Sequence, residues 1–496
     1  RWRIYRFGAS LTGKKNHPTI KDTEGLEVDK LDPEAWTRFF HNYLDLYREA
    51  SGGLMGEHGI QYLLNDSYEA GQATWTPKME AEFEARHGYA LKAWLPALAG
   101  EIIGSTDESE RFLHDWRETL GELFVENHDR LNGILAEYGI KGRYTESHEN
   151  GHAYVGDGMD LKRGAAVPMS AFWFHNQGSG PVTSMSRADI KESASVAHIY
   201  GQNLVAAESF TVSGLHNLAY TYCPSKLKPL ADFAFSCGLN RIVIHDSAHQ
   251  PNDDAVPGTG LLRYGQWFNR HETWAGMAKP WMDYLARSCY MLQQGQYVAD
   301  VLVYYGEDNS ITGVYGHSWP DVAAGYSFDF VSPSALLDRV SARDGKMVTD
   351  TGMEYSVLYL GDNCKVMSVK ILRKLAELAE AGVDICGLPP VRPASLEDDP
   401  QEFDRLVDSI WNSGREDLFV THPHEHLAKL GISEDFRSDG DADFVHRRLQ
   451  DGTDIYWVRN RSERDRNMTF SMRREGGNAL VFDPVSGKSW RVNAVH

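Results

Sequence analysis

The sequence predicts an α/β protein, made of a (β/α)8 TIM-type barrel, a small α/β (Rossmann-like) domain and a β-rich C-terminal segment. Short β-like runs alternate with helix-like runs up to about residue 306, which is typical of βα units around a parallel sheet. After Gly306 the chain becomes rich in Gly, Ser and Pro, and from about Asp443 it reads as short strands with Gly-rich turns. We therefore place the domains at residues 1–306, 307–418 and 419–496.

The barrel is expected to contain eight strands, each a run of apolar or β-branched residues bounded by turn residues. In chain order they are residues 3–9, 25–29, 60–66, 142–146, 167–173, 204–208, 241–245 and 301–305. Amphipathic runs between them predict helices, among them residues 33–50, 111–138 and 281–294.

The second domain is predicted to be a compact α/β unit, with strands at residues 355–360 and 383–387 around a helix at 368–381. It has no GxGxxG or GxxxxGK[ST] pattern and is acidic at 397–399, so we expect a structural or assembly role. In the third domain, strands are predicted at residues 454–458, 469–473 and 479–483, as in a β-sandwich or the beginning of one.

Composition and charge restrict the class of partner. The 50 basic and 70 acidic residues give a formal charge of −20, which repels phosphate backbones and excludes nucleic acid as an expected partner. No run of roughly 18 apolar residues exists, so no membrane span is expected. The five cysteines lack CxxC spacing and indicate neither a disulfide framework nor a zinc site. The 13 Trp and 23 Tyr suit either sugar stacking or a large core.

Polar residues close most of the predicted barrel strands: Asp29, Asp66, Glu146, Glu208 and His245. In a barrel the carboxyl ends of the strands form the reactive face. Burying so many ionisable groups would cost desolvation energy unless they served chemistry. This pattern predicts an active site built of carboxylates at that face.

Two carboxyl groups are needed to hydrolyse a glycosidic bond, one to protonate the leaving oxygen and one to activate water or attack the anomeric carbon. Glu208 is the strongest candidate because it ends the buried run 203–207, although it could also be a strand-end cap. Glu69 follows Asp66 in the loop after residues 60–66, and one of these two could instead cap the next helix.

Other polar groups near the strand ends permit more than one role. Glu146 and Glu149 flank His148, and such an arrangement either catalyses, holds a cation or binds sugar hydroxyls. His245 and His249 are spaced i and i+4 at a strand end without an HExxH pattern, which disfavours zinc. We interpret these two histidines as hydroxyl-binding groups or structural imidazoles. No GxSxG elbow occurs, so acyl-transfer chemistry is set aside.

The chain contains a specific series of segments, including GLEVDKL at 25–31, DSYEAG at 66–71, WTP at 75–77 and RFLHDWR at 111–117. The series continues with VPM at 167–169, FW at 172–173, AHIYG at 197–201, AESFT at 207–211 and IHDSAHQP at 244–251. In this order it resembles glycoside hydrolase family 106, the α-L-rhamnosidases. The resemblance spans nearly the whole chain and is weakest after residue 310. Tyr68, where Trp is expected, and the His- and Gly-rich segment after Glu146 depart from it.

The resemblance implies an inverting enzyme that acts on a rhamnose-containing glycan or glycoside, in a bacterial periplasmic or secreted setting. It places the acid at Glu69 and the base at Glu208, with Glu146 in reserve. It also implies a calcium ion near the sugar hydroxyls, with ligands left open. Substrate contacts are expected from Asp29, Asp66, His148, Trp173, His245 and His249.

Two other functions are weighed against this one. A catalytically silent carbohydrate-binding barrel would lack a productive carboxylate pair, and the presence of Glu69 and Glu208 argues against it. A polysaccharide lyase needs cationic groups around a uronate, which the negative charge makes less natural. The chain starts at Arg1, and residues 4–8 read as a strand rather than a signal peptide, so we expect the true N-terminus to be missing.

Overall fold

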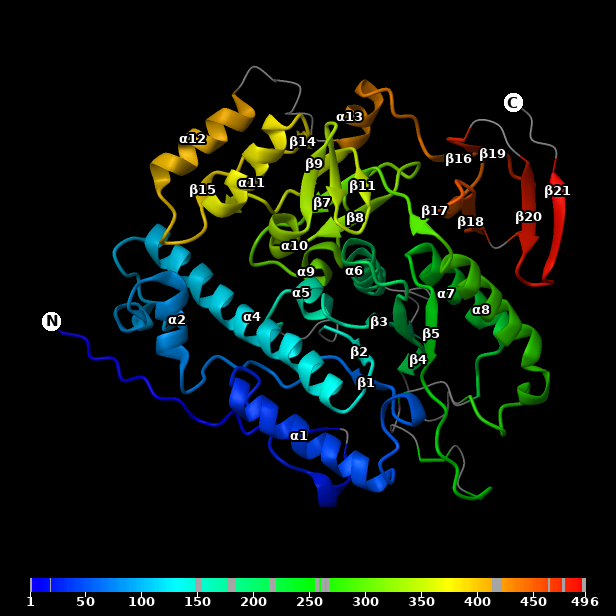
Figure 1. Ribbon diagram of the computed structural model, residues 1–496, viewed down its shortest axis with the longest axis horizontal. Helices are drawn as coiled ribbons and strands as arrows, with labels where there is room; N and C mark the ends of the chain where they lie inside the picture. Colours follow the sequence, from blue (N-terminus) through cyan, green and yellow to red (C-terminus); the bar gives the residue numbers. More distant parts are fainter. Residues whose placement is uncertain are drawn as a thin grey trace.

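A computed structural model describes the chain except residues 1, 18, 148–153, 176–183, 214–219, 255–257, 260–263, 265–267, 413–421, 463, 475–477 and 493–496. Its centre is a curled half-barrel, a sheet of five parallel strands in the order β1-β2-β3-β4-β5 (Figure 1). These strands are β1 (Tyr62–Asn65), β2 (Gly142–Thr145), β3 (Val167–His175), β4 (Ala206–Ser213) and β5 (Arg241–Ile244). They confirm five of the eight predicted strands.

The three other predicted barrel strands are not part of this sheet. Residues 3–9 and 25–29 form no strand, and the segment around them is largely exposed, with one bridge between Lys15 and Leu26. An extended run becomes a strand only where neighbours satisfy its backbone groups. Residues 301–305 do contain a strand, β7 (Val301–Tyr304), but it lies in a second sheet. Within the described part of the chain, the sheet therefore forms half a barrel rather than a closed one.

Helices cover the half-barrel. They are α1 (Pro33–Ala50), α2 (Met79–His87), α3 (Leu95–Leu98), α4 (Thr106–Glu137), α5 (Gly158–Lys162), α6 (Ser184–Tyr200), α7 (Pro224–Ser236) and α8 (Lys279–Leu292). The three predicted helices correspond to α1, α4 and α8. The side chains of Asp32 and Ser105 accept backbone hydrogen bonds at the starts of α1 and α4, which fixes where these helices begin.

The accessory α/β unit follows, and it confirms the predicted strands and helix of this region. Its parallel sheet, ordered β14-β12-β7-β8, also contains β8 (Phe328–Val331), β12 (Val357–Leu360) and β14 (Asp384–Cys386). Around it lie α9 (Ile311–Tyr315), α10 (Pro333–Asp338), α11 (Val369–Glu380), α12 (Pro400–Trp411) and α13 (Pro423–Lys429). Short strands complete the unit: β9 (Val340–Arg343), β10 (Lys346–Thr349), β11 (Glu354–Tyr355), β13 (Val366–Met367) and β15 (Arg392–Pro393).

The C-terminal region is β-rich, as predicted. Its strands are β16 (Phe436–Ser438), β17 (Ala442–Arg448), β18 (Asp454–Asn460), β19 (Phe470–Met472), β20 (Ala479–Asp483) and β21 (Lys488–Val492). They form small antiparallel sheets, one of which includes β6 (Gln296–Tyr297). In Figure 1 the β20–β21 hairpin lies at the edge of the molecule, beside α8.

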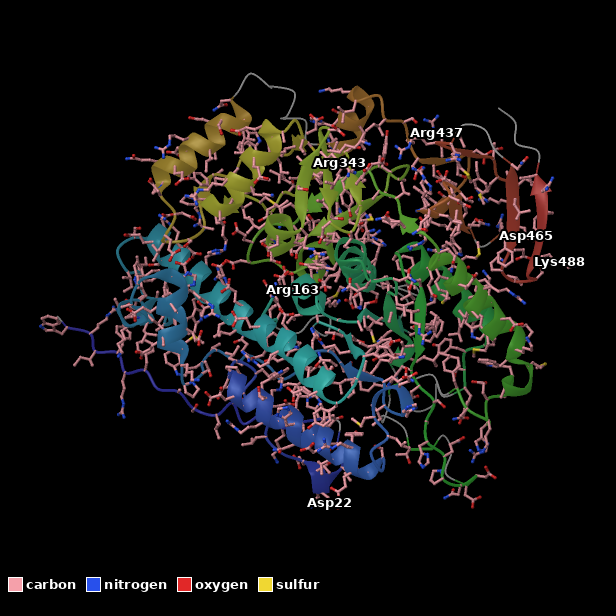
Figure 2. All side chains as sticks on the ribbon, in the orientation of Figure 1. Asp22, Arg163, Arg343, Arg437, Asp465 and Lys488 are labelled. Atoms are coloured by element: carbon pink, nitrogen blue, oxygen red, sulfur yellow. The ribbon has the colours of Figure 1, made fainter. Side chains whose placement is uncertain are left out.

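Helix α6 is the layer shared by the two parallel sheets, because it packs against β3 on one side and against β8 and α9 on the other. Asp329 of β8 is fully buried and accepts hydrogen bonds from Lys191 and His198 of α6. Arg163, labelled in Figure 2, lies at the end of α5, where it pairs with Asp129 of α4. None of the helices in the described residues is long and apolar enough to cross a membrane.

Candidate active site

Three carboxylates meet at one end of the half-barrel: Asp66, Glu146 and Glu208. One oxygen from each lies within 4.8 Å of the others. Asp66 and Glu146 directly follow β1 and β2, whose register pairs Asn65 with Thr145. The Glu146 N–H donates to the Asn65 carbonyl at 3.0 Å, which holds the two loops together. Three groups that the sequence placed at strand ends therefore form one cluster.

Glu208 is the third residue of β4, and a local irregularity of the strand follows it. Phe210 has a φ of 71°, and the β3–β4 register shifts beside Trp173. The Thr211 hydroxyl donates to Glu208 Oε1 at 2.5 Å, and His245 Nδ1 lies 4.0 Å from the same oxygen. Burial raises the pKa of Glu208, while His245 and the hydrogen bonds from Thr211 and Trp173 oppose this rise.

Glu146 is the most deeply buried member of the cluster. Its side chain is buried, and its Oε1 has no hydrogen-bond partner among the described residues. Burial raises the pKa of Glu146 well above its usual range, and the charges of Asp66 and Glu208 raise it further. These shifts disfavour three ionised carboxylates in the cluster without a proton or a cation among them.

A buried ionic network lies behind Glu146. Lys162, at the end of α5, has no exposed surface, and its Nζ lies 2.8 Å from Glu192 Oε1 and 3.2 Å from Asp189 Oδ1. Glu192 also accepts a hydrogen bond from the Ser147 hydroxyl at 3.0 Å. This network was not predicted from the sequence. The available signal was the series of charged residues in the otherwise small and apolar stretch 188–199.

Glu69 and Asp29 lie in loops tied by local hydrogen bonds. Glu69 is half-buried and accepts a hydrogen bond from the Ser67 hydroxyl at 2.9 Å, and it is not one of the three clustered carboxylates. Asp29 accepts from the Leu31 N–H and from the Thr76 hydroxyl, at 2.9 and 3.0 Å. Asp29 therefore joins two loops, which is sufficient reason for a carboxylate at this position.

The remaining predicted substrate contacts lie in different surroundings. Trp173 projects from β3, with its ring 5.6 Å from that of Tyr264. His245 directly follows β5 and faces Glu208, whereas His249 is exposed in the loop beyond. His148 lies outside the described residues.

The structure also contains a cavity of about 1320 Å³ away from the carboxylates. It is lined by residues that precede β4 and β7, such as Asn203 and Ala299, and by the β17–β18 hairpin. None of the three clustered carboxylates lines it. The cavity thus lies at the opposite ends of the parallel strands from the cluster.

In comparisons with known proteins, one family model matches almost the whole chain. The alpha-L-rhamnosidase model of glycoside hydrolase family 106 matches residues 1–495. A protein of Formosa agariphila named "Putative beta-glucuronidase" is 34% identical over 98% of this chain and 40% of its own length. A solved rhamnosidase from Novosphingobium sp. PP1Y is 37% identical, with a TM-score of 0.91 over 97% of this chain and 47% of its own. The chain thus spans less than half of these relatives. It belongs to the alpha-L-rhamnosidase family, glycoside hydrolase family 106.

Proposed function

We propose that this chain carries the catalytic unit of a glycosidase that removes a terminal α-L-rhamnosyl or related deoxy-sugar residue with inversion. The observation that carries the proposal is the cluster formed by Asp66 and Glu146, which directly follow β1 and β2, and by Glu208 of β4. Family membership and the likeness to the Novosphingobium rhamnosidase support the choice of sugar. The substrate is then a rhamnose-containing glycan or glycoside.

Glu208 is proposed as the general base and Glu69 as the general acid. Inverting enzymes separate their two carboxyl groups by roughly 6.5–9.5 Å to leave room for a water. Glu146 shares the cluster with Glu208, and we assign it to a cation instead of to acid catalysis. Glu208 is therefore paired with a carboxylate outside the cluster. We choose Glu69 because it follows Asp66 closely in the same loop. Glu208 receives a hydrogen bond from Thr211, which orients it.

Calcium is proposed at Asp66 and Glu146. Two oxygens bound to one Ca²⁺ at about 2.3–2.6 Å lie no more than about 5 Å apart, and the cluster meets this condition. Glu146 Oε1 lacks a hydrogen-bond donor among the described residues, so a cation would satisfy it. When bound, the ion would neutralise the repulsion between the carboxylates and coordinate sugar hydroxyls.

The test uses aryl glycosides and the folded chain. Hydrolysis of an aryl α-L-rhamnoside, with the β-anomer of the sugar released first in an NMR time course, is the expected result. Turnover of an aryl β-glucuronide alone would instead assign this chain the activity in the name of its Formosa relative. Sugar binding without turnover of any glycoside would favour the silent barrel, and an unsaturated uronide product would indicate a lyase.

A further inference from the structure

A second group of metal-type ligands lies between α2 and α4, apart from the carboxylate cluster. His87 is the last residue of α2, while Asp115 and Glu118 are three residues apart on α4 and so share one face of that helix. One ligand atom from each of the three residues lies within 4.8 Å of the others. None of them belongs to the proposed active site.

The hydrogen bonds around His87 fix where its proton lies. The Thr119 hydroxyl donates its proton to the Asp115 backbone carbonyl at 2.9 Å, so Thr119 Oγ1 accepts from His87 Nε2, also at 2.9 Å. Nε2 therefore carries the ring proton and Nδ1 has a free lone pair.

Asp115 presents an unsatisfied oxygen to that lone pair. The residue is fully buried, and its Oδ2 accepts from the Tyr89 hydroxyl at 2.7 Å and from the Leu396 N–H at 3.1 Å. Its Oδ1 has no hydrogen-bond partner among the described residues and lies 3.9 Å from His87 Nδ1. Two acceptors thus face each other with no proton between them, and leaving such a buried oxygen unpaired is costly.

We propose that His87, Asp115 and Glu118 bind a divalent cation of the Zn²⁺ type. A neutral imidazole together with carboxylates suits Zn²⁺, whereas Ca²⁺ and Mg²⁺ prefer all-oxygen sites. A cavity of about 200 Å³, lined in part by Glu118, Glu397 and Lys370, adjoins the group at Glu118. Lys370 pairs with Glu118 Oε1 and orients that side chain.

The position of this site suggests a stabilising role. The ion would join the end of α2 to the middle of α4. Asp115 also holds the Leu396 backbone, and Arg111, one turn earlier on α4, donates to the Ser395 carbonyl at 2.6 Å. The metal would therefore fix the contact between the helical layer and the accessory unit, and its binding should protect the folded state.

The experiment uses the full chain, freed of metal by chelator and then held in saturating Ca²⁺ so that the acidic cluster is filled. Zn²⁺ is added, with calorimetry and thermal unfolding as readouts. We expect one tight Zn²⁺ equivalent and a rise in the melting temperature for the wild type. The same is expected for E122Q, a control on the next turn of α4, and for D66N, a control in the carboxylate cluster. H87Q and D115N should bind at least tenfold more weakly.

Two results would overturn the proposal. One is a wild type that binds no more Zn²⁺ than H87Q and D115N do. The other is a Zn²⁺ step that D66N abolishes and H87Q retains, which would assign the ion to the carboxylate cluster. If the buried variants do not fold, X-ray absorption of the Zn²⁺-loaded wild type decides, since imidazole scattering is expected and its absence would refute a ligand at His87.

Discussion

Replacing Asp329 with Asn is expected to weaken the contact between the two parallel sheets. Asp329 is fully buried on β8 and accepts hydrogen bonds from Lys191 Nζ at 3.1 Å, His198 Nδ1 at 2.9 Å and the Tyr355 hydroxyl at 2.9 Å. Burial alone would raise the pKa of this carboxyl, but the charges of His198 and Lys191 outweigh burial and lower it to about 2. Asn keeps the shape of the side chain but removes the charge and replaces one of the two acceptor oxygens by an NH2 donor.

The magnitude follows from that shift. A fall in the pKa of Asp329 from 3.8 to about 2 corresponds to about 2 kcal/mol of folding free energy. Because the folded-state pKa is depressed, this stabilisation is present above about pH 4 and is lost as the pH falls through about 2. Burial lowers the pKa of His198, so this histidine is neutral at pH 7 and becomes charged in acid. At pH 7 the Asn variant leaves Lys191 buried without its counter-charge, which costs about 3–5 kcal/mol.

Urea unfolding followed by tryptophan fluorescence provides the assay. With a slope of about 3 kcal/mol per molar urea, a loss of about 3–5 kcal/mol should lower the midpoint of D329N by about 1–1.7 M at pH 7. Between pH 4 and 2 the wild type should lose stability more steeply than the variant. D350N, which removes the exposed partner of Arg339, is the control and should shift the free energy of unfolding by less than about 0.5 kcal/mol. A D329N midpoint equal to that of D350N would refute the reasoning.

Three further changes test the site and its support. Glu208→Gln should lower kcat by roughly 10²–10⁴-fold without changing the circular dichroism spectrum, because it removes the proposed general base. Removing divalent cations with a chelator should lower activity, and adding Ca²⁺ should restore it, because Asp66 and Glu146 need a counter-charge. Lys162→Met should destabilise the fold by about 3–5 kcal/mol in urea unfolding, because it leaves Asp189 and Glu192 unpaired and buried.

Each of these predictions has a contrary outcome. Near-native turnover of E208Q would remove Glu208 from the catalytic pair. Unchanged activity after exhaustive dialysis, with no metal found by elemental analysis, would show that the carboxylates need no ion. For Lys162 the control is Lys279→Met, which removes an exposed partner of Asp283, and equal effects of the two substitutions would contradict a special role for the buried lysine.

Half of the barrel could be predicted from the sequence because its strands are short apolar runs closed by turn residues. The runs that become β1 to β5 follow this pattern. Residues 301–305 follow it equally well, since β7 is buried throughout, and a buried parallel strand looks the same in either sheet. Residues 3–9 have the apolar content of a strand without neighbours to pair with. Which strands pair with each other is decided by the whole fold, and a short run of residues does not reveal it.

The positions of Asp66 and Glu146 were predictable because each directly follows a strand, and parallel strands bring their carboxyl ends to one edge. Glu208 was expected to end its strand as well, but it lies inside β4, which continues to Ser213.

The network of Lys162, Asp189 and Glu192 was not predictable, because it forms between two helices that no periodicity connects. The same holds for His87 and Asp115, which the chain brings together only by packing α2 on α4. Contacts of this kind depend on helix orientation, which the sequence pattern does not encode.

Among the residues that the structure describes, no strand pairs with the outer side of β1, and this affects how the chain is expected to behave in solution. Strand β1 is the first in the sheet order, and its Tyr62 and Leu64 side chains are 41% and 52% exposed. Natural proteins usually protect an edge strand with charged residues, proline or a covering segment, because its unpaired backbone N–H groups can pair with a strand of another molecule. In this protein the exposed side chains of the edge strand β1 are the apolar Tyr62 and Leu64. We expect self-association along β1 to limit the concentration at which this chain stays monomeric, which light scattering would detect as growth in particle size without loss of helix signal.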